Sequence, residues 1–90
     1  MVIKMIFSFK VNSPGDIIAT LENLQKKLAQ HKGKFNGDEK GGFISSNGID
    51  GQYIVKENTI EITVLKKPLL IPNKVIEKEI KKIFTEVSVQ

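Results

Sequence analysis

The sequence predicts an α+β domain, a two-layer sandwich in which an antiparallel sheet of four to five strands carries two helices on one face. Three observations lead to this prediction. The chain has only 90 residues, apolar side chains alternate along several short segments, and two longer segments repeat them at helical spacing. A content of 40% apolar and 27% charged residues is typical of a globular chain. We therefore expect one domain over residues 1–90, with element order β-α-β-β-β(β)-α.

The first predicted strand runs from Ile3 to Val11. Apolar residues occupy every second position, and most of the positions between them are polar. A period of two residues is that of a strand with one face on the core. The side chains expected to point inward are Ile3, Met5, Phe7, Phe9 and Val11.

The first helix is predicted to begin with Ser13 as its N-cap and Pro14 at its first helical position. An ion pair is expected between Glu22 and Lys26, which stand four residues apart. The helix should end at Gly33. Its apolar stripe has the spacing i, i+4, i+7 and i+11 and consists of Ile17, Leu21, Leu24 and Leu28.

Six of the seven glycines lie between residues 33 and 58, a pattern that indicates short strands joined by tight turns. The predicted strands are 34–36, 42–46 and 51–56, and the predicted turns are 37–41 and 47–50.

A further strand is predicted over residues 59–65, with Ile60, Ile62 and Val64 pointing inward. Glu57 and Asn58 would form the hairpin turn before it, with Asn58 at a positive φ.

The second helix is predicted to follow a segment that contains two prolines, Pro68 and Pro72, which exclude regular structure between them. Asn73 is expected to cap this helix, and Glu77 to pair with Lys81. Residues 85–90 are expected to fray. The apolar stripe of the helix consists of Ile76, Ile80, Ile83 and Val87.

Several classes of chemistry are excluded or disfavoured by the composition. The absence of cysteine excludes disulfides, thiolate zinc sites and thiol catalysis. The single histidine, His31, is interpreted as a solvated side chain near a helix C-terminus. The carboxylates Asp38, Glu39 and Asp50 lack the spacing of a calcium loop and are interpreted as turn residues. We therefore expect no enzymatic activity, no cofactor and no metal.

The chain shows neither an apolar run of the ~20 residues that a membrane-spanning helix requires nor a signal peptide. From these absences and the lack of cysteine we expect a cytoplasmic protein without a transmembrane segment.

The most unusual segment places three consecutive aliphatic residues between Pro68 and Pro72, next to lysines. Two hypotheses account for it. The aliphatic side chains plug the open end of the core, or they are presented to a hydrophobic surface or a protein partner. Under the second hypothesis the partner-binding residues are Lys67, Pro68, Leu69, Leu70, Ile71, Pro72 and Lys74.

Nucleic-acid binding is the alternative function, since basic domains that end in a helix include double-stranded RNA modules. It would use lysines around the second helix, namely Lys66, Lys67, Lys74, Lys78, Lys81 and Lys82. All 14 basic residues are lysine, however, so the chain lacks the guanidinium groups that favour phosphate sites. Glu77, Glu79 and Glu86 reduce the local charge, and the few aromatic residues form no clear stacking platform. Nucleic acid is therefore not the partner we expect.

Two segments resemble the polyhydroxyalkanoic acid system proteins, a family of small bacterial proteins linked to polyester-storage granules. Leu69-Leu70-Ile71-Pro72, followed by Lys74 and the charged helix from Ile76, is similar to that family's leucine-leucine-small-proline segment. Asn47-Gly48-Ile49-Asp50-Gly51, leading into Tyr53-Ile54-Val55, is similar to its Gly-Val-Xaa-Gly turn before a strand.

The element order agrees with that family from residue 1 to about 87, whereas two features depart from it. Lys67-Pro68 stands where the family has an apolar or aromatic residue, and the family's arginine-rich helices are lysine-rich here. The resemblance implies a non-enzymatic role near a granule or another hydrophobic assembly, and it assigns no catalytic residue.

Overall fold

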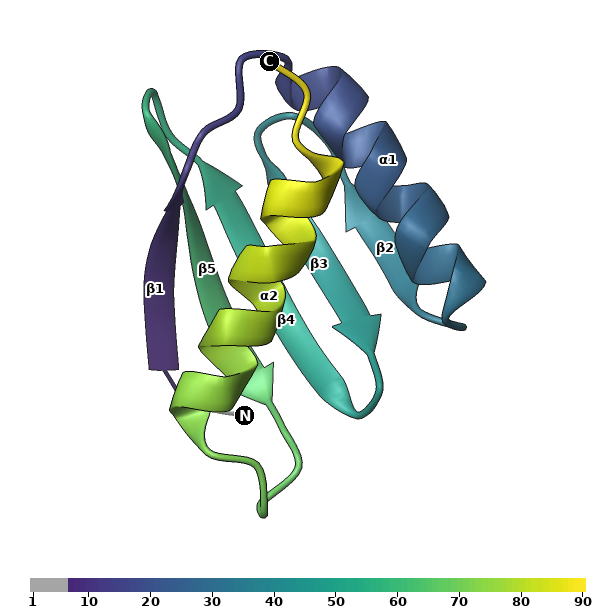
Figure 1. The fold of residues 1–90 in the computed structure, drawn as a ribbon, viewed down its shortest axis with the longest axis vertical. Helices are drawn as coiled ribbons and strands as arrows, with labels where there is room; N and C mark the ends of the chain where they lie inside the picture. Colours follow the sequence, from purple (N-terminus) through teal and green to yellow (C-terminus); the bar gives the residue numbers. More distant parts are fainter. Residues whose placement is uncertain (1–6) are drawn as a thin grey trace.

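The computed structural model describes residues 7–90 and contains a five-stranded antiparallel sheet with two helices on one face (Figure 1). The predicted α+β class and element order are confirmed, with four strands between the helices. The elements are β1 (Phe7–Asn12), α1 (Ile17–Gln30), β2 (Lys34–Gly37), β3 (Gly41–Ser46), β4 (Ile49–Val55), β5 (Thr59–Lys66) and α2 (Asn73–Val87).

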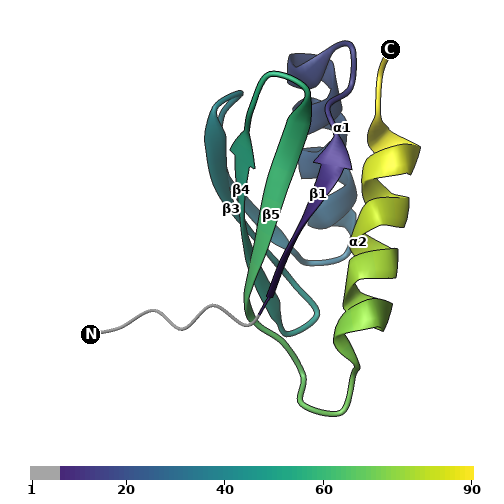
Figure 2. The same cartoon turned by 90° about the vertical axis from the view of Figure 1, so that its left-hand side faces the viewer.

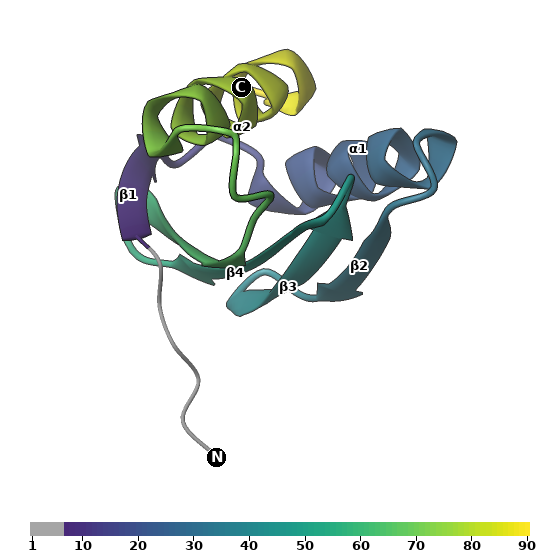
Figure 3. The same cartoon turned by 90° about the horizontal axis from the view of Figure 1, so that it is seen from below.

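The strands lie in the order β1-β5-β4-β3-β2, so β1 and β2 form opposite edges of the sheet. Helix α1 connects these two edges and thereby crosses the whole sheet. Strands β2 to β5 are consecutive hairpins, and β1 pairs with β5 to complete the sheet. Figure 2 shows the sheet and the helices as two layers, and Figure 3 shows both helices over the same face.

The centre of the core is the inward face of β5. Its side chains Ile60, Ile62 and Val64 are all fully buried, as the alternation predicts. The partly buried side chains of β1 pair with them in register, Phe7 with Val64 and Phe9 with Ile62. The predictions for Ile3 and Met5 lie outside the described residues. Helix α1 adds its predicted apolar stripe to this core, with Ile17 only partly buried.

Helix α1 begins later than predicted. Asp16, rather than Ser13, is the N-cap, because its Oδ1 accepts a hydrogen bond from the backbone N–H of Ala19 at 3.0 Å. Ser13 lies three residues before this cap, and its backbone N–H donates to the carbonyl of Asn58 at 3.0 Å. The helix ends at Gln30, and the left-handed residue beyond it is Lys32 (φ 60°) rather than Gly33.

Four glycines, Gly37, Gly41, Gly42 and Gly51, lie inside strands rather than in turns. Gly37 and Gly42 pair across β2 and β3, directly beneath the ring of Tyr53. An added Cβ on Gly37 would lie 2.5 Å from the Tyr53 hydroxyl, and one on Gly42 would lie 3.0 Å from the ring. These two glycines therefore allow the tyrosine to be fully buried.

The turn between β3 and β4 is shorter than predicted. Asn47 (φ 54°) and Gly48 (φ 80°) alone connect β3 to β4, so β4 begins at Ile49. Two successive positive φ angles are typical of the type I′ hairpin that an Asn-Gly pair favours. Among the described residues, the only other non-glycine at positive φ is Lys32, so the prediction for Asn58 is wrong. The β4–β5 turn is closed instead by the Lys56 N–H, which donates to the carbonyl of Thr59 at 2.8 Å.

Helix α2 differs from its prediction at both ends. Pro72 is its N-cap, Asn73 is its first helical residue, and no side chain caps it. The predicted fraying of the last residues is wrong, because the N–H of Val89 donates to Thr20 Oγ1 at 3.0 Å and its carbonyl accepts from Asp16 at 2.8 Å. The buried residues of α2 are Ile76, Ile80, Phe84 and Val87, so Phe84 takes the place predicted for Ile83, which is only partly buried.

The two predicted ion pairs have different outcomes. Glu77 and Lys81 pair at 2.9 Å, which confirms the second. Among the described residues, α1 contributes Lys27 to a pair with Glu86 of α2, and the predicted Glu22–Lys26 pair is not formed.

Candidate functional site

The segment that connects β5 to α2, residues 67–72, is called the leucine turn below. It lies at one end of the longest axis of the molecule, beyond the sheet and beyond the first turn of α2 (Figure 1). Of the seven predicted site residues, six lie in this turn, and Lys74 follows it in the first turn of α2.

The two leucines of this turn are the most exposed large apolar residues among those described. Leu69 is 95% exposed and Leu70 is 97% exposed, whereas the other exposed large apolar side chains reach at most 57%. Ile71 differs from them, because it is partly buried and packs against the core. The two hypotheses for the aliphatic segment therefore apply to different residues. Ile71 closes the core, whereas both leucines face solvent.

The turn is held in one shape by Lys67. Its ammonium group donates to the carbonyl of Ile71 at 2.7 Å and lies 3.4 Å from that of Pro68. The same two residues are joined by a backbone hydrogen bond from the Ile71 N–H to the Pro68 carbonyl at 3.3 Å. Since Pro68 and Pro72 also have fixed φ angles, the leucines are presented on ordered backbone. Less conformational entropy is then lost when they bind.

Other parts of the fold lie beside the turn. Gly48 lies beside it, since a Cβ on this glycine would stand 3.6 Å from Pro68 Cγ. On the other side Ile71 packs against the core cluster. The two leucine side chains project from this end into solvent.

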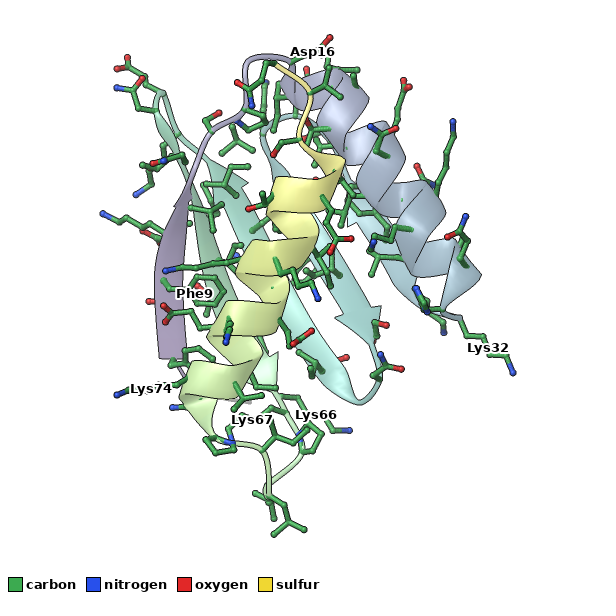
Figure 4. The ribbon with its side chains drawn as sticks, in the orientation of Figure 1. Phe9, Asp16, Lys32, Lys66, Lys67 and Lys74 are labelled. Atoms are coloured by element: carbon green, nitrogen blue, oxygen red, sulfur yellow. The ribbon has the colours of Figure 1, made fainter. Side chains whose placement is uncertain are left out.

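The surroundings of the turn are basic. Residues 62–76 contain Lys66, Lys67 and Lys74 and no acidic residue. Lys66 and Lys74 are exposed, and Figure 4 shows all three lysines at the end that carries the leucine turn. The first turn of α2 has no acidic side chain, so the positive end of its helix dipole is not opposed there.

The last two lysines of the predicted basic cluster, Lys81 and Lys82, point elsewhere. Lys81 pairs with Glu77, and its Nζ lies 5.8 Å from the centroid of the Phe9 ring on the β1 side. Lys82 lines a depression on the α1 side together with Lys27 and Glu86. The basic cluster is therefore divided in space. Lys66, Lys67 and Lys74 lie at the end of the molecule that carries the leucines, and Lys81 and Lys82 do not point towards it.

An apolar groove lies between the two helices, above β3 and β4, with a volume of about 270 Å³. Its walls are mainly aliphatic side chains from both helices, including Leu28 and Ile83, and its rim carries Asn47 and Glu79. Ile71 lines it as well, so the groove reaches the base of the leucine turn.

The polar residues considered for chemistry are used by the local structure. Asp38 Oδ1 accepts hydrogen bonds from the backbone N–H groups of Lys40 and Gly41, which lower the pKa of this carboxyl. Asp50 accepts a hydrogen bond from Ser45 at 2.7 Å. His31 is exposed and is the C-cap of α1. Within residues 7–90, no three His, Cys, Asp or Glu side chains are grouped so that they could hold a metal ion.

Tyr53 is the one strongly perturbed titratable group among those described. Its hydroxyl donates to the carbonyl of Asp38 at 2.7 Å, and its ring stacks on Phe35 with centroids 5.9 Å apart. Burial, with a smaller contribution from the carboxylates of Asp38 and Glu39, raises its pKa to about 12. A neutral tyrosine that is fully buried serves the core rather than a site.

Two properties of the site were not predicted from the sequence. These are the carbonyl contacts of Lys67 and the place of the β3–β4 turn beside Pro68, where a Cβ on Gly48 would stand 3.6 Å from Pro68 Cγ. Neither helix of the described chain, residues 7–90, is long and apolar enough to cross a membrane. Comparisons with family models, with curated proteins and with solved structures find no match to this chain.

Proposed function

We propose that this protein is a small non-enzymatic binding protein that attaches to a hydrophobic partner surface through Leu69 and Leu70. The observation that carries the proposal is the almost complete exposure of two adjacent leucines, 95% and 97%, on a turn that Lys67 holds in shape. A pair of exposed aliphatic side chains is costly in water unless a partner covers it.

The attachment of one copy would be weak. Burying two leucine side chains contributes about 3–6 kcal/mol before the cost of association is subtracted. Many copies on one surface would raise the overall affinity through their effective concentration. A surface that accepts many copies therefore suits this site better than a single small ligand.

The resemblance to the polyhydroxyalkanoic acid system proteins supports a specific surface of this kind. We propose the storage-polyester granule of a bacterial cytoplasm as the hydrophobic assembly. Leu69 and Leu70, which belong to one of the two segments that carry the resemblance, are the side chains that project from the fold.

The proposal is tested by sedimenting the protein with purified polyester granules. The variant Leu69→Ser with Leu70→Ser is expected to remain in the supernatant, whereas the wild type sediments. The matched control is Ile18→Ser, which changes an exposed aliphatic residue (57%) on the outer side of α1 and is expected to sediment like the wild type. All three proteins are expected to melt alike, and granule binding by the double variant would contradict the proposal.

The alternative of nucleic-acid binding through the lysines predicts a different behaviour. Its affinity would fall steeply with salt, because bound phosphates release counterions. A gel-shift titration at two salt concentrations tests it, and absence of any retained nucleic acid at low salt would remove it. The division of the lysine cluster, with Lys81 paired to Glu77 and Lys82 on the opposite side, supports the apolar site instead.

A further inference from the structure

We infer that the surface which the leucine turn contacts is an anionic lipid layer, with Leu69 and Leu70 inserted among the lipids and lysines placed at the headgroups. This inference rests on the proposed function, because it uses the same turn. It adds the chemistry of the outermost layer of that hydrophobic assembly, which the exposed leucines alone do not specify.

The residues around the turn fit lipid better than a protein partner. Segment 66–78 contains no aromatic residue and no arginine, which are the residues that dominate the binding energy of protein interfaces. A stable protein interface also buries about 800 Å² on each partner, usually around a packed centre. Here two flexible aliphatic side chains project from a narrow tip, and a fluid apolar layer accommodates such a tip without a matching pocket.

The charges around the tip provide the second part of the argument. Lys66 precedes the turn, Lys74 follows it, and Lys78 lies one helical turn further along α2, all exposed. Figure 4 shows Lys66 and Lys74 beside the tip, so insertion of the leucines would bring both ammonium groups close to a headgroup layer. An apolar tip combined with basic side chains is the pattern of proteins that lie at anionic membrane surfaces.

The acidic groups near the tip do not cancel this charge. Glu77 is paired with Lys81 at 2.9 Å, and Glu79 lies at the rim of the groove between the helices. The first turn of α2 lacks an acidic side chain and a side-chain cap, which leaves its positive end unopposed. Lys67 has a different role, since its ammonium is bound to the carbonyls of the turn, and it acts as a positioning residue.

The inference is tested by co-sedimentation with two kinds of vesicle, phosphatidylcholine alone and phosphatidylcholine with about 30 mol% phosphatidylglycerol. The wild type is expected to bind the anionic vesicles at least about tenfold more tightly, and to lose most of this preference at high salt. Leu69→Ser with Leu70→Ser is expected to abolish binding to both kinds of vesicle.

Charge variants separate the role of the lysines from that of the leucines. Lys66→Gln with Lys74→Gln is expected to weaken binding to the anionic vesicles about 10- to 30-fold, since each lysine near the surface contributes about fivefold. The matched control, Lys40→Gln with Lys56→Gln, removes the same charge from exposed turns at the opposite end of the sheet. It is expected to change the affinity by less than about threefold.

Each opposite result overturns a defined part of the inference. Equal binding to both kinds of vesicle would remove the role of the anionic headgroups. No binding to either, with granule binding still lost in the double leucine variant, would remove lipid as the partner and leave the proposed function intact. Self-association that depends on Leu69 and Leu70, seen by sedimentation velocity without vesicle binding, would make a second copy of the chain the partner. If the leucines affect neither granules nor vesicles, both proposals fail.

Discussion

The two ends of the sheet differ in the hydrogen bonds that hold their loops in place. At the capped end, which holds loops 13–16, 38–40, 56–58 and residues 88–90, hydrogen bonds join segments that are far apart in sequence. Ser13 donates to the carbonyl of Asn58, Asp16 donates to the carbonyl of Val89, and Val55 donates to that of Lys40. At the end that carries the leucine turn, the hydrogen bonds of Lys67 stay within the turn itself.

The helix N-termini show the same contrast. Helix α1 begins at the capped end, where Asp16 accepts a hydrogen bond from the backbone of Ala19. Helix α2 begins beside the leucine turn without any side-chain cap. Figure 4 shows Asp16 and Lys74 near opposite ends of the molecule. The comparison teaches that stabilising contacts are concentrated at one end, which leaves the other free to present apolar and basic groups.

The largest expected effect is on the free energy of unfolding, and it distinguishes a buried leucine from an exposed one. Leu24→Ala, at a side chain that is 1% exposed in the core, is expected to lower the free energy of unfolding by about 2–5 kcal/mol. Leu70→Ala, at a side chain that is 97% exposed, is expected to change it by less than about 0.5 kcal/mol. Urea denaturation measures both. A similar loss in the two variants would mean that Leu70 is packed in solution.

The second effect concerns Tyr53, whose hydroxyl is bonded to the loop 38–40 of the capped end. Its pKa is raised to about 12, so the folded state favours the neutral phenol. The resulting stability is complete below pH 10, the pKa of an unfolded tyrosine, and is lost as the pH rises towards 12, by about 2–3 kcal/mol in total.

Ultraviolet absorbance at high pH follows this ionisation directly, because Tyr53 is the only tyrosine in the chain. A midpoint near pH 10 while the protein remains folded would contradict burial of the ring. The control is Tyr53→Phe, whose stability is expected to lack the decrease between pH 10 and 12.

A smaller effect is expected from Thr20→Val at the capped end. The buried Thr20 hydroxyl donates to the carbonyl of Asp16 at 2.7 Å and accepts from the N–H of Val89 at 3.0 Å. Losing both hydrogen bonds should cost about 1–2 kcal/mol. Hydrogen exchange is expected to show faster exchange of the Val89 amide, and unchanged exchange there would mean that the chain terminus is held by other contacts.

The smallest effect is expected from a substitution in the first turn of α2, the helix that has no side-chain cap. Asn73→Asp places a carboxylate in the first turn of α2, where the helix dipole should stabilise the protein by about 0.3–1 kcal/mol. The same change adds a negative charge beside Lys74 and is expected to weaken binding to anionic vesicles. Thermal melting and vesicle co-sedimentation measure the two effects, and tighter vesicle binding would count against the role of positive charge at this end.

The fold was predictable wherever periodicity was decisive. Alternation identified the inward face of β5, and helical spacing identified the buried stripe of α1. The start of α1 was not predictable, because Ser13 and Asp16 are both good caps and only the structure shows that Asp16 accepts the capping hydrogen bond from Ala19. Gly37 and Gly41 were assigned to the turn 37–41, because nothing local shows that Tyr53 will cover the paired glycines Gly37 and Gly42 and so favour strands there.

The candidate site was predictable in its residues but not in its geometry. The composition of residues 67–72 identified an unusual loop, and the same aliphatic residues fit a core plug equally well. What separates Ile71 from the two leucines is its packing against the core cluster, and the turn is held by the contact of Lys67 with the Ile71 carbonyl. A sequence pattern contains neither of these contacts.

The pairing of β1 with β5 has a consequence for the order in which the chain folds. Strands β2 to β5 are joined by turns of two or three residues, whereas Phe9 pairs with Ile62, more than fifty residues away. Closing so long a loop is slow compared with closing a hairpin. We therefore expect β1 to join last, and pulsed hydrogen exchange should find its amides protected after those of β3 and β4. Until then the edge of β5, the most apolar strand of the sheet, is open to pairing with another chain, so aggregation during refolding should increase steeply with protein concentration.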